Sequence, residues 1–190
     1  MKETEVTVQV FQSLNEVKEI LLSNKFELIE TYGLDDWYFS GLAEVENLDY
    51  KTLIANSFLV RDIITNEHNP QICYKNKIID DDGCVILEEK TVTKIDNLEN
   101  AISIFEQANL NNWCKMKTKQ YVFKKGEIEF VVQDVEGLGV FIEYEEDETM
   151  RDLDVNQKID LMTTRLKNLN LKIGNDFSCK KVFMKLHKND

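Results

Sequence analysis

The sequence predicts an α+β fold in which about eight mostly antiparallel strands, with flanking helices, form a closed β-tunnel. Three observations indicate this class. Stretches in which apolar and polar residues alternate, as they do in strands, cover much of the chain. Three other stretches carry apolar residues at helical spacing. Several of the strands have ionisable residues at every second position, and a sheet rolled with that face inward needs counter-ions beside them.

The first strand is expected over residues 3–10, because the two sets of alternating side chains differ in polarity. Thr4, Val6, Val8 and Val10 would point to one side, and Glu3, Glu5, Thr7 and Gln9 to the other. Ser13-Leu14-Asn15-Glu16 then has the form of a capping box. Apolar residues recur at helical spacing from Leu14 to about Phe26, so a helix follows the strand.

A second strand–helix–strand unit is expected later in the chain. Asp96 or Asn97 can cap a helix that runs from Leu98 to about Leu110. An offset of 84 (98 − 14) aligns Leu14 with Leu98, Val17 with Ala101, Ile20 with Ile104, Phe26 with Leu110, Phe39 with Phe123 and Glu5 with Glu89. The pattern predicts an internal duplication.

The remaining elements are mostly strands. They are predicted at residues 37–40, 57–64, 71–79, 84–94, 115–123, 127–134 and 140–146. Asp82-Gly83 and Lys125-Gly126 mark two hairpins, because glycine supplies the positive φ that tight turns require. A last helix is expected over about Val155 to Leu169, followed by a short strand near Lys181 to Leu186.

The composition fits a single domain over residues 1–190. A chain with 43% hydrophobic residues can bury one sizeable core, and one proline and seven glycines leave no flexible linker. The formal charge of −12 would repel nucleic acid and anionic membranes. No apolar run is long enough to span a membrane, and no signal peptide is recognisable. We therefore expect a cytoplasmic protein that binds neither nucleic acid nor membrane. Its oligomeric state stays open, with a homodimer as one possibility.

The cysteines do not indicate a metal or catalytic site. The four of them are widely spaced, form no CxxC pair, and have only His68 and His187 as nitrogen partners. This argues against a zinc site. Buried thiols in a reducing compartment are the expected alternative.

The charged strand faces point to a ligand instead. A polar face on one strand is normally solvated. Here, however, Lys115, Lys117 and Lys119 share one face, while Glu143 and Glu145 share another. Arg61 and Lys75 add single cations in otherwise neutral or apolar strands. A polyphosphate with a divalent metal would satisfy both kinds of charge, because carboxylates bind Mg²⁺ or Mn²⁺ while Lys and Arg neutralise phosphate oxygens.

These strands resemble those of the CYTH family, the triphosphate tunnel metalloenzymes that include class IV adenylate cyclases and thiamine triphosphatases. The resemblance runs from about Glu3 to Lys185. Its shorter matches are Glu3-Thr4-Glu5-Val6-Thr7 to an ExExK strand, Leu34-Asp35-Asp36-Trp37-Tyr38-Phe39 to D-x-YF, Phe58-Leu59-Val60-Arg61 to L-R-x-R, Cys73-Tyr74-Lys75 to L-T-Y-K and Lys117-Thr118-Lys119 to K-x-R. The longest match, from Asp134 to Glu145, resembles D-x-V-x-G-L-G-x-F-x-E-x-E.

The resemblance implies a role for each matched residue. It implies Mg²⁺ or Mn²⁺ as cofactor, with Glu5, Glu143 and Glu145 as the catalytic carboxylates. The implied metal ligands are Glu3, Glu5, Asp134, Glu143, Glu145 and one of Glu88 or Glu89. Of these last two, we expect Glu89 to be the ligand. The implied phosphate-binding residues are Arg61, Lys75, Lys117, Lys119 and Lys181.

The function implied is metal-dependent hydrolysis of a triphosphate-bearing small molecule: tripolyphosphate, thiamine triphosphate or a nucleoside triphosphate. Two departures keep alternatives open, because Thr7 stands where the family has lysine and Leu59 stands where it has arginine. Each removes a phosphate contact of about 1.5–3 kcal/mol. Lys119 in place of arginine also loses bidentate geometry. The alternatives are a catalytically weakened triphosphate-binding or sensor protein, and a class IV-type adenylate cyclase.

Overall fold

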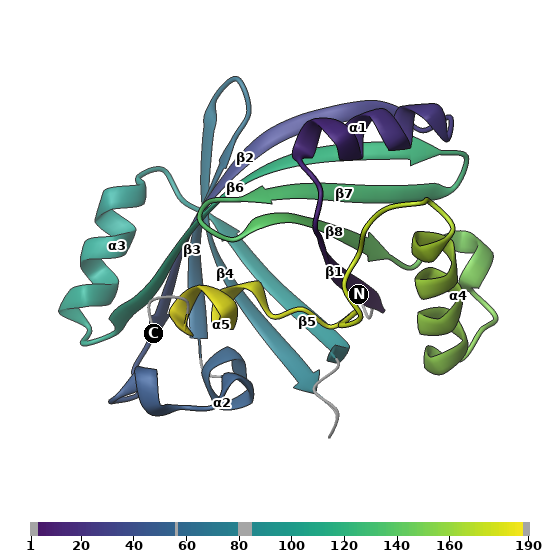
Figure 1. Cartoon of the computed structure of the whole chain (residues 1–190). Helices are drawn as coiled ribbons and strands as arrows, with labels where there is room; N and C mark the ends of the chain where they lie inside the picture. Colours follow the sequence, from purple (N-terminus) through teal and green to yellow (C-terminus); the bar gives the residue numbers. More distant parts are fainter. Residues whose placement is uncertain (1–3, 56, 80–84, 188–190) are drawn as a thin grey trace. The chain divides into compact units, whose positions relative to one another are not determined.

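The computed structural model describes residues 4–55, 57–79 and 85–187, and for residues 50, 79 and 85–88 it describes the backbone alone. Strands and helices follow one another along the chain as labelled in Figure 1. The strands are β1 (Glu5–Val10), β2 (Glu27–Ser40), β3 (Ser57–Ile64), β4 (His68–Ile79), β5 (Val85–Lys94), β6 (Asn111–Lys125), β7 (Ile128–Val135) and β8 (Gly139–Glu145). The helices are α1 (Leu14–Ser23), α2 (Tyr50–Ala55), α3 (Leu98–Gln107), α4 (Val155–Lys167) and α5 (Lys181–Leu186), with short 3₁₀ turns at Val45–Asn47 and Glu148–Met150. Among the described residues, β3 to β5 and β6 to β8 are two runs of strands without a helix between them.

The strands form one sheet in the order β1-β8-β7-β6-β2-β3-β4-β5. The pairs β1/β8, β2/β3, β3/β4, β4/β5 and β7/β8 are all antiparallel. The predicted α+β class, with eight strands and flanking helices, is therefore confirmed. Among the described residues, β1 and β5 are the two ends of the strand order, so backbone hydrogen bonds do not close the sheet.

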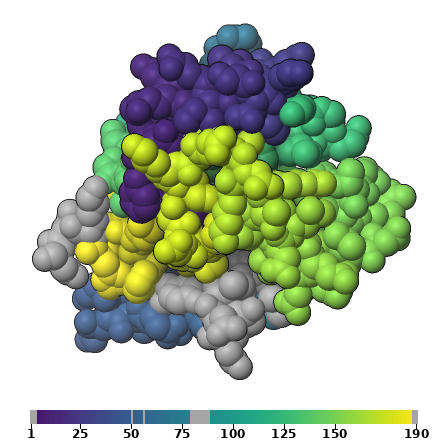
Figure 2. Space-filling model, turned by 45° about the vertical axis from the view of Figure 1, so that its right-hand side comes forward, coloured from purple at the N-terminus to yellow at the C-terminus, as the bar shows by residue number. Residues whose placement is uncertain are grey.

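The outer edge of β1 is covered by the segment that precedes α5. Thr7 N donates to the carbonyl of Phe177 at 3.0 Å, and Gly174 N donates to the carbonyl of Gln9 at 2.9 Å. Figure 2 shows this yellow-green segment against the purple N-terminal residues. An edge strand normally has to be blunted or covered to avoid pairing with another chain. This segment does so for β1.

The described residues group into two compact units. Unit 1 comprises residues 32–55, 57–79, 85–118 and 180–187, and unit 2 comprises residues 4–31 and 119–179. The core of unit 2 packs β1, β6, β7 and β8 against α1 and α4, whereas the core of unit 1 packs β2 and β3 against α3. The expectation of a single domain stays a prediction.

The strand–helix–strand unit expected to be duplicated occurs twice in the structure. With the offset of 84, α1 and α3 start at equivalent positions, as do β2 and β6. Ser13 and Asn97 are the equivalent N-caps. After each helix an equivalent residue adopts positive φ, 66° at Lys25 and 61° at Asn109. The following N–H in each copy donates to the carbonyl five residues earlier, which is the Schellman ending of a helix.

Several elements differ from the prediction. The segment Lys181–Leu186 is the helix α5 rather than a strand. Its short apolar run fits either element, and periodicity alone does not decide between them. β2 begins at Glu27, ten residues before the predicted start, because its exposed first half does not alternate. α2 was not predicted at all. The turn at Lys125-Gly126 is confirmed, with φ +61° at Gly126, whereas Asp82-Gly83 lies outside the described residues.

Within the part of the chain that the structure describes, no helix combines the length and the apolar character needed to cross a membrane. Where in the cell the chain works stays a prediction.

Candidate functional site

Strand alternation in unit 2 separates an apolar face from an acidic one. Val6, Val8 and Val10 on β1 pack in the core with Ile142 and Tyr144 on β8. The intervening residues therefore occupy the opposite face of the sheet. On that face Glu5 lies directly across from Glu145, and Thr7 lies across from Glu143.

Three of the predicted catalytic and metal-binding carboxylates converge on this face. Glu5, Glu143 and Glu145 each offer one oxygen, and these three oxygens lie within 4.8 Å of one another. Like charges this close repel one another, so a cation between them would be stabilising. Carboxylate oxygens are the hard ligands that Mg²⁺ and Mn²⁺ favour, so the residues present fit such an ion.

The other predicted metal ligands do not join this group. Glu3 lies outside the described residues. Asp134 alternates with Gln133, so it lies on the side of β7 that carries Val132, and it is exposed. The family pattern explains the shift, because reading D-x-V-x-G-L-G back from Val135 places its aspartate at Gln133. A displacement of one residue moves a side chain to the other face of a strand.

Glu89, the remaining predicted metal ligand, belongs to unit 1 and lies on the opposite strand face from Lys75 and Lys90. It pairs with Asn76 in the register of β4 and β5, and it is exposed. Lys75 pairs with Lys90 one position along, so these two lysines stand on the other face. Glu88 pairs with Lys77 on β4.

The cationic face of unit 1 is built around Arg61 on β3. Arg61 Nε and Nη2 donate to the two carboxylate oxygens of Asp36 on β2, both at 2.7 Å. Burial lowers the pKa of Arg61, but the charge and hydrogen bonds of Asp36 outweigh it and raise that pKa above its ordinary value. Arg61 therefore stays charged, with its charge largely balanced by Asp36.

Lys75 and Lys90 add two cations to this face. They lie directly across from each other on β4 and β5, next to the buried Cys73. Burial raises the pKa of the Cys73 thiol, although Arg61, Lys90 and Lys75 each act to lower it. All three cations therefore lie within electrostatic range of one buried atom. Lys90 was missed from the sequence, where its only signal is alternation with Val92 and Lys94.

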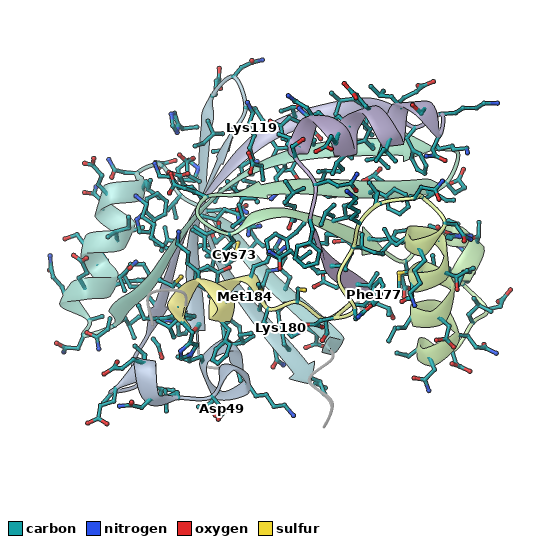
Figure 3. The ribbon with its side chains drawn as sticks, in the orientation of Figure 1. Asp49, Cys73, Lys119, Phe177, Lys180 and Met184 are labelled. Carbon is teal, nitrogen blue, oxygen red and sulfur yellow. The ribbon has the colours of Figure 1, made fainter. Side chains whose placement is uncertain are left out.

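The predicted phosphate-binding lysines of β6 lie on other surfaces. Lys117 Nζ is 3.7 Å from an oxygen of Asp35. Asp35 and Asp36 are neighbours on β2, so Asp35 points to the opposite face from Asp36, the partner of Arg61. Lys119 shares a strand face with Tyr121, a core residue of unit 2, and its Nζ lies 5.7 Å from the centre of that ring. Figure 3 shows Lys119 on the α1 side of the sheet. Whether Lys117 and Lys119 bind phosphate stays a prediction.

Lys181, the last predicted phosphate ligand, is the first residue of α5 in unit 1 and is partly buried. Leu59, which stands at the first arginine of the family's L-R-x-R pattern, is buried two residues before Arg61 on the same face of β3. Thr7 is buried as well. Leu59 therefore lies on the cationic face of unit 1, and Thr7 lies on the acidic face of unit 2.

Comparison with known proteins gives one curated relative and several similar structures. No family model matches the chain. A protein of Methanocaldococcus jannaschii named "Putative adenylate cyclase MJ0240" is 28% identical over 178 residues, which cover 92% of this chain and 93% of that protein. These values indicate similarity along nearly the whole length.

The similar structures agree on the fold. A protein of Pyrococcus horikoshii superposes with a TM-score of 0.73 at 16% identity, covering 98% of this chain and 99% of the other. A Hippeastrum protein, named as a putative adenylyl cyclase and described as having a dominant triphosphatase activity, has a TM-score of 0.62 at 14% identity, covering 99% and 96%. These findings support the family resemblance drawn from the sequence.

Proposed function

We propose that this chain, which is CYTH-like, is a Mg²⁺- or Mn²⁺-dependent phosphohydrolase that acts on a small triphosphate-bearing molecule. The observation that carries the proposal is the convergence of Glu5, Glu143 and Glu145 on one sheet face. The adenylate cyclase name of the curated relative and the triphosphatase activity stated for the Hippeastrum protein support the same ligand class.

The residues would divide the work by charge. A divalent metal, when bound, would polarise the phosphorus that is attacked and stabilise the charge on the leaving group. The three carboxylates would hold that metal. On unit 1, the face that carries Arg61, Lys75 and Lys90 has the charge needed to bind phosphate oxygens. The negative net charge of the protein makes a nucleic acid an unsuitable partner.

The test is phosphate release from tripolyphosphate, thiamine triphosphate and ATP, with and without Mg²⁺ or Mn²⁺. We expect metal-dependent turnover that Glu143→Gln abolishes. Glu129→Gln is a matched control, because Glu129 is an exposed carboxylate on β7 that pairs with Lys124 instead. No metal-dependent turnover on any substrate would refute hydrolysis, and equal loss in both variants would refute the role of the three carboxylates.

A second candidate is a triphosphate-binding or sensor protein without turnover. Two contacts favour this candidate. Asp36 balances the charge of Arg61, and the neutral Thr7, where the family has lysine, lies across from Glu143. The binding function predicts that tripolyphosphate with Mn²⁺ raises the melting temperature without product formation. Thr7→Lys should then tighten binding. Adenylate cyclase activity is the third candidate, and it requires cyclic AMP as the product from ATP.

A further inference from the structure

Gln133 on β7 donates a hydrogen bond from Nε2 to Oε2 of Glu143 at 3.1 Å. The amide is only 5% exposed, and it stands on the same face of unit 2 as the three converging carboxylates. Glu143 is the middle member of that face, opposite Thr7 and one strand away from Gln133. A buried neutral side chain therefore touches one of the residues that would hold the metal.

Burial gives this contact more weight than an exposed hydrogen bond would have. Among the described residues, β1 and β8 contribute no lysine or arginine to this face. A hydrogen bond to a ligating carboxylate fixes the orientation of that carboxylate. A carboxylate also has spare lone pairs, so one amide bond does not use up the capacity of Glu143 to bind a metal.

We propose that Gln133 is a positioning residue for the metal site: its amide holds Glu143 correctly oriented, and so determines how tightly a divalent metal binds. The inference rests on the proposed function, because it needs the carboxylates to bind a metal. Hydrogen-bond partners of ligating carboxylates commonly account for about 10- to 100-fold in metal affinity. A neutral donor also contributes this orientation without adding a charge that would compete with the metal.

Gln120 on β6 provides the matched control. It is another buried glutamine, 3% exposed, and it alternates with the core residue Tyr121, which places it on the Gln133 side of the sheet. Its Oε1 has no hydrogen-bond partner. Replacing Gln120 with leucine removes a buried amide of the same size without removing the contact to Glu143. It therefore reports any general effect of making this face more apolar.

The experiment is calorimetric titration of the metal-free chain with MnCl₂ at about pH 8, because metals bind the deprotonated ligands. We expect Gln133→Leu to weaken Mn²⁺ binding about 10- to 100-fold. We also expect it to change the electron paramagnetic resonance spectrum of the bound Mn²⁺, whereas Gln120→Leu should leave that spectrum unchanged and the affinity within about threefold of wild type. Gln133→Met, which has nearly the same length and no donor, replaces the leucine variant if that variant is unstable.

Each remaining outcome decides a different question. Wild-type affinity and an unchanged Mn²⁺ spectrum in Gln133→Leu would overturn the positioning role while leaving the metal site intact. An equal loss in Gln120→Leu would assign the effect to packing and overturn it too. Absence of Mn²⁺ binding by the wild-type chain would overturn the proposed function, and this inference with it.

Discussion

The buried pair between Asp36 and Arg61 makes the most quantitative prediction. The two side chains are 7% and 15% exposed, and both carboxylate oxygens of Asp36 accept from the guanidinium. Asp36→Ala would leave the guanidinium in unit 1 without its partner. Removing one member of a buried pair costs about 3–5 kcal/mol, because an uncompensated charge stays behind. For a chain of this length that corresponds to about 6–20 °C in melting temperature.

A second pair supplies the contrast. Arg151 and Glu148 form an ion pair on the surface, with side chains 73% and 67% exposed. Exposed pairs contribute about 0–1 kcal/mol, so Glu148→Ala should change stability little. The double variant Asp36→Leu, Arg61→Met removes both buried charges together. It should recover most of the loss, because replacing a buried pair by apolar residues is often neutral or stabilising.

The assay is urea unfolding of the wild type and the three variants, with the free energy of unfolding obtained by linear extrapolation. Asp36→Ala is expected to lose at least about 3 kcal/mol and the double variant much less. If Asp36→Ala lowers the free energy of unfolding no more than Glu148→Ala does, the Asp36–Arg61 pair behaves like a solvent-exposed ion pair. The interpretation of Arg61 as a charge already balanced by Asp36 would then have to be abandoned.

Three further predictions concern other charged or buried groups. Arg165→Leu removes the donor that reaches Asp147 from α4 at 2.7 Å, so unfolding should become easier by about 1.5–3 kcal/mol in urea titration; an unchanged midpoint would contradict this anchoring role. The hydrogen bond and charge of Asp62 raise the pKa of His68 above 6.5. The His68–Asp62 pair therefore stabilises the folded state fully at pH values below 6.5, and this stabilisation is lost as the pH rises through the raised pKa. The stability difference between wild type and His68→Gln should accordingly be larger at about pH 5.5 than at about pH 9, and a reversed order would refute the pairing. Burial raises the pKa of Cys114 from 9.0 to about 11. At pH 8 the thiolate fraction of Cys114 should therefore be about 100-fold lower in the folded chain than in the unfolded chain. Its rate of alkylation, measured by mass spectrometry, should be lower by the same factor.

Helix positions and strand faces were predictable wherever burial enforces a regular period. The capping box at Ser13 marked the start of α1, and the offset of 84 located α3 from it. Glu143 and Glu145 could be assigned to one face because Ile142 and Tyr144 had to be buried on the other. The first half of β2 was missed because its residues are exposed, which removes the alternation.

The candidate site was predicted only in part. Glu5, Glu143 and Glu145 come together on one face of the strands in unit 2. Asp134 and Lys119 lie on the other face, which carries the core residues. A motif match tolerates a shift of one residue, but a strand does not, because each step turns the side chain to the other side. The family pattern, correctly aligned, pointed to position 133, but the role of the Gln133 amide shows only through the atom that it contacts.

By itself, the sequence determined the fold class, the duplication and the acidic character of one strand face, because these follow from local periodicity and from residue type. Only the tertiary structure decided which charges meet. It paired Arg61 with Asp36 across two strands and placed Gln133 on Glu143. Such contacts depend on strand register and on hydrogen-bond geometry between residues far apart in the chain, and local patterns carry no information about either.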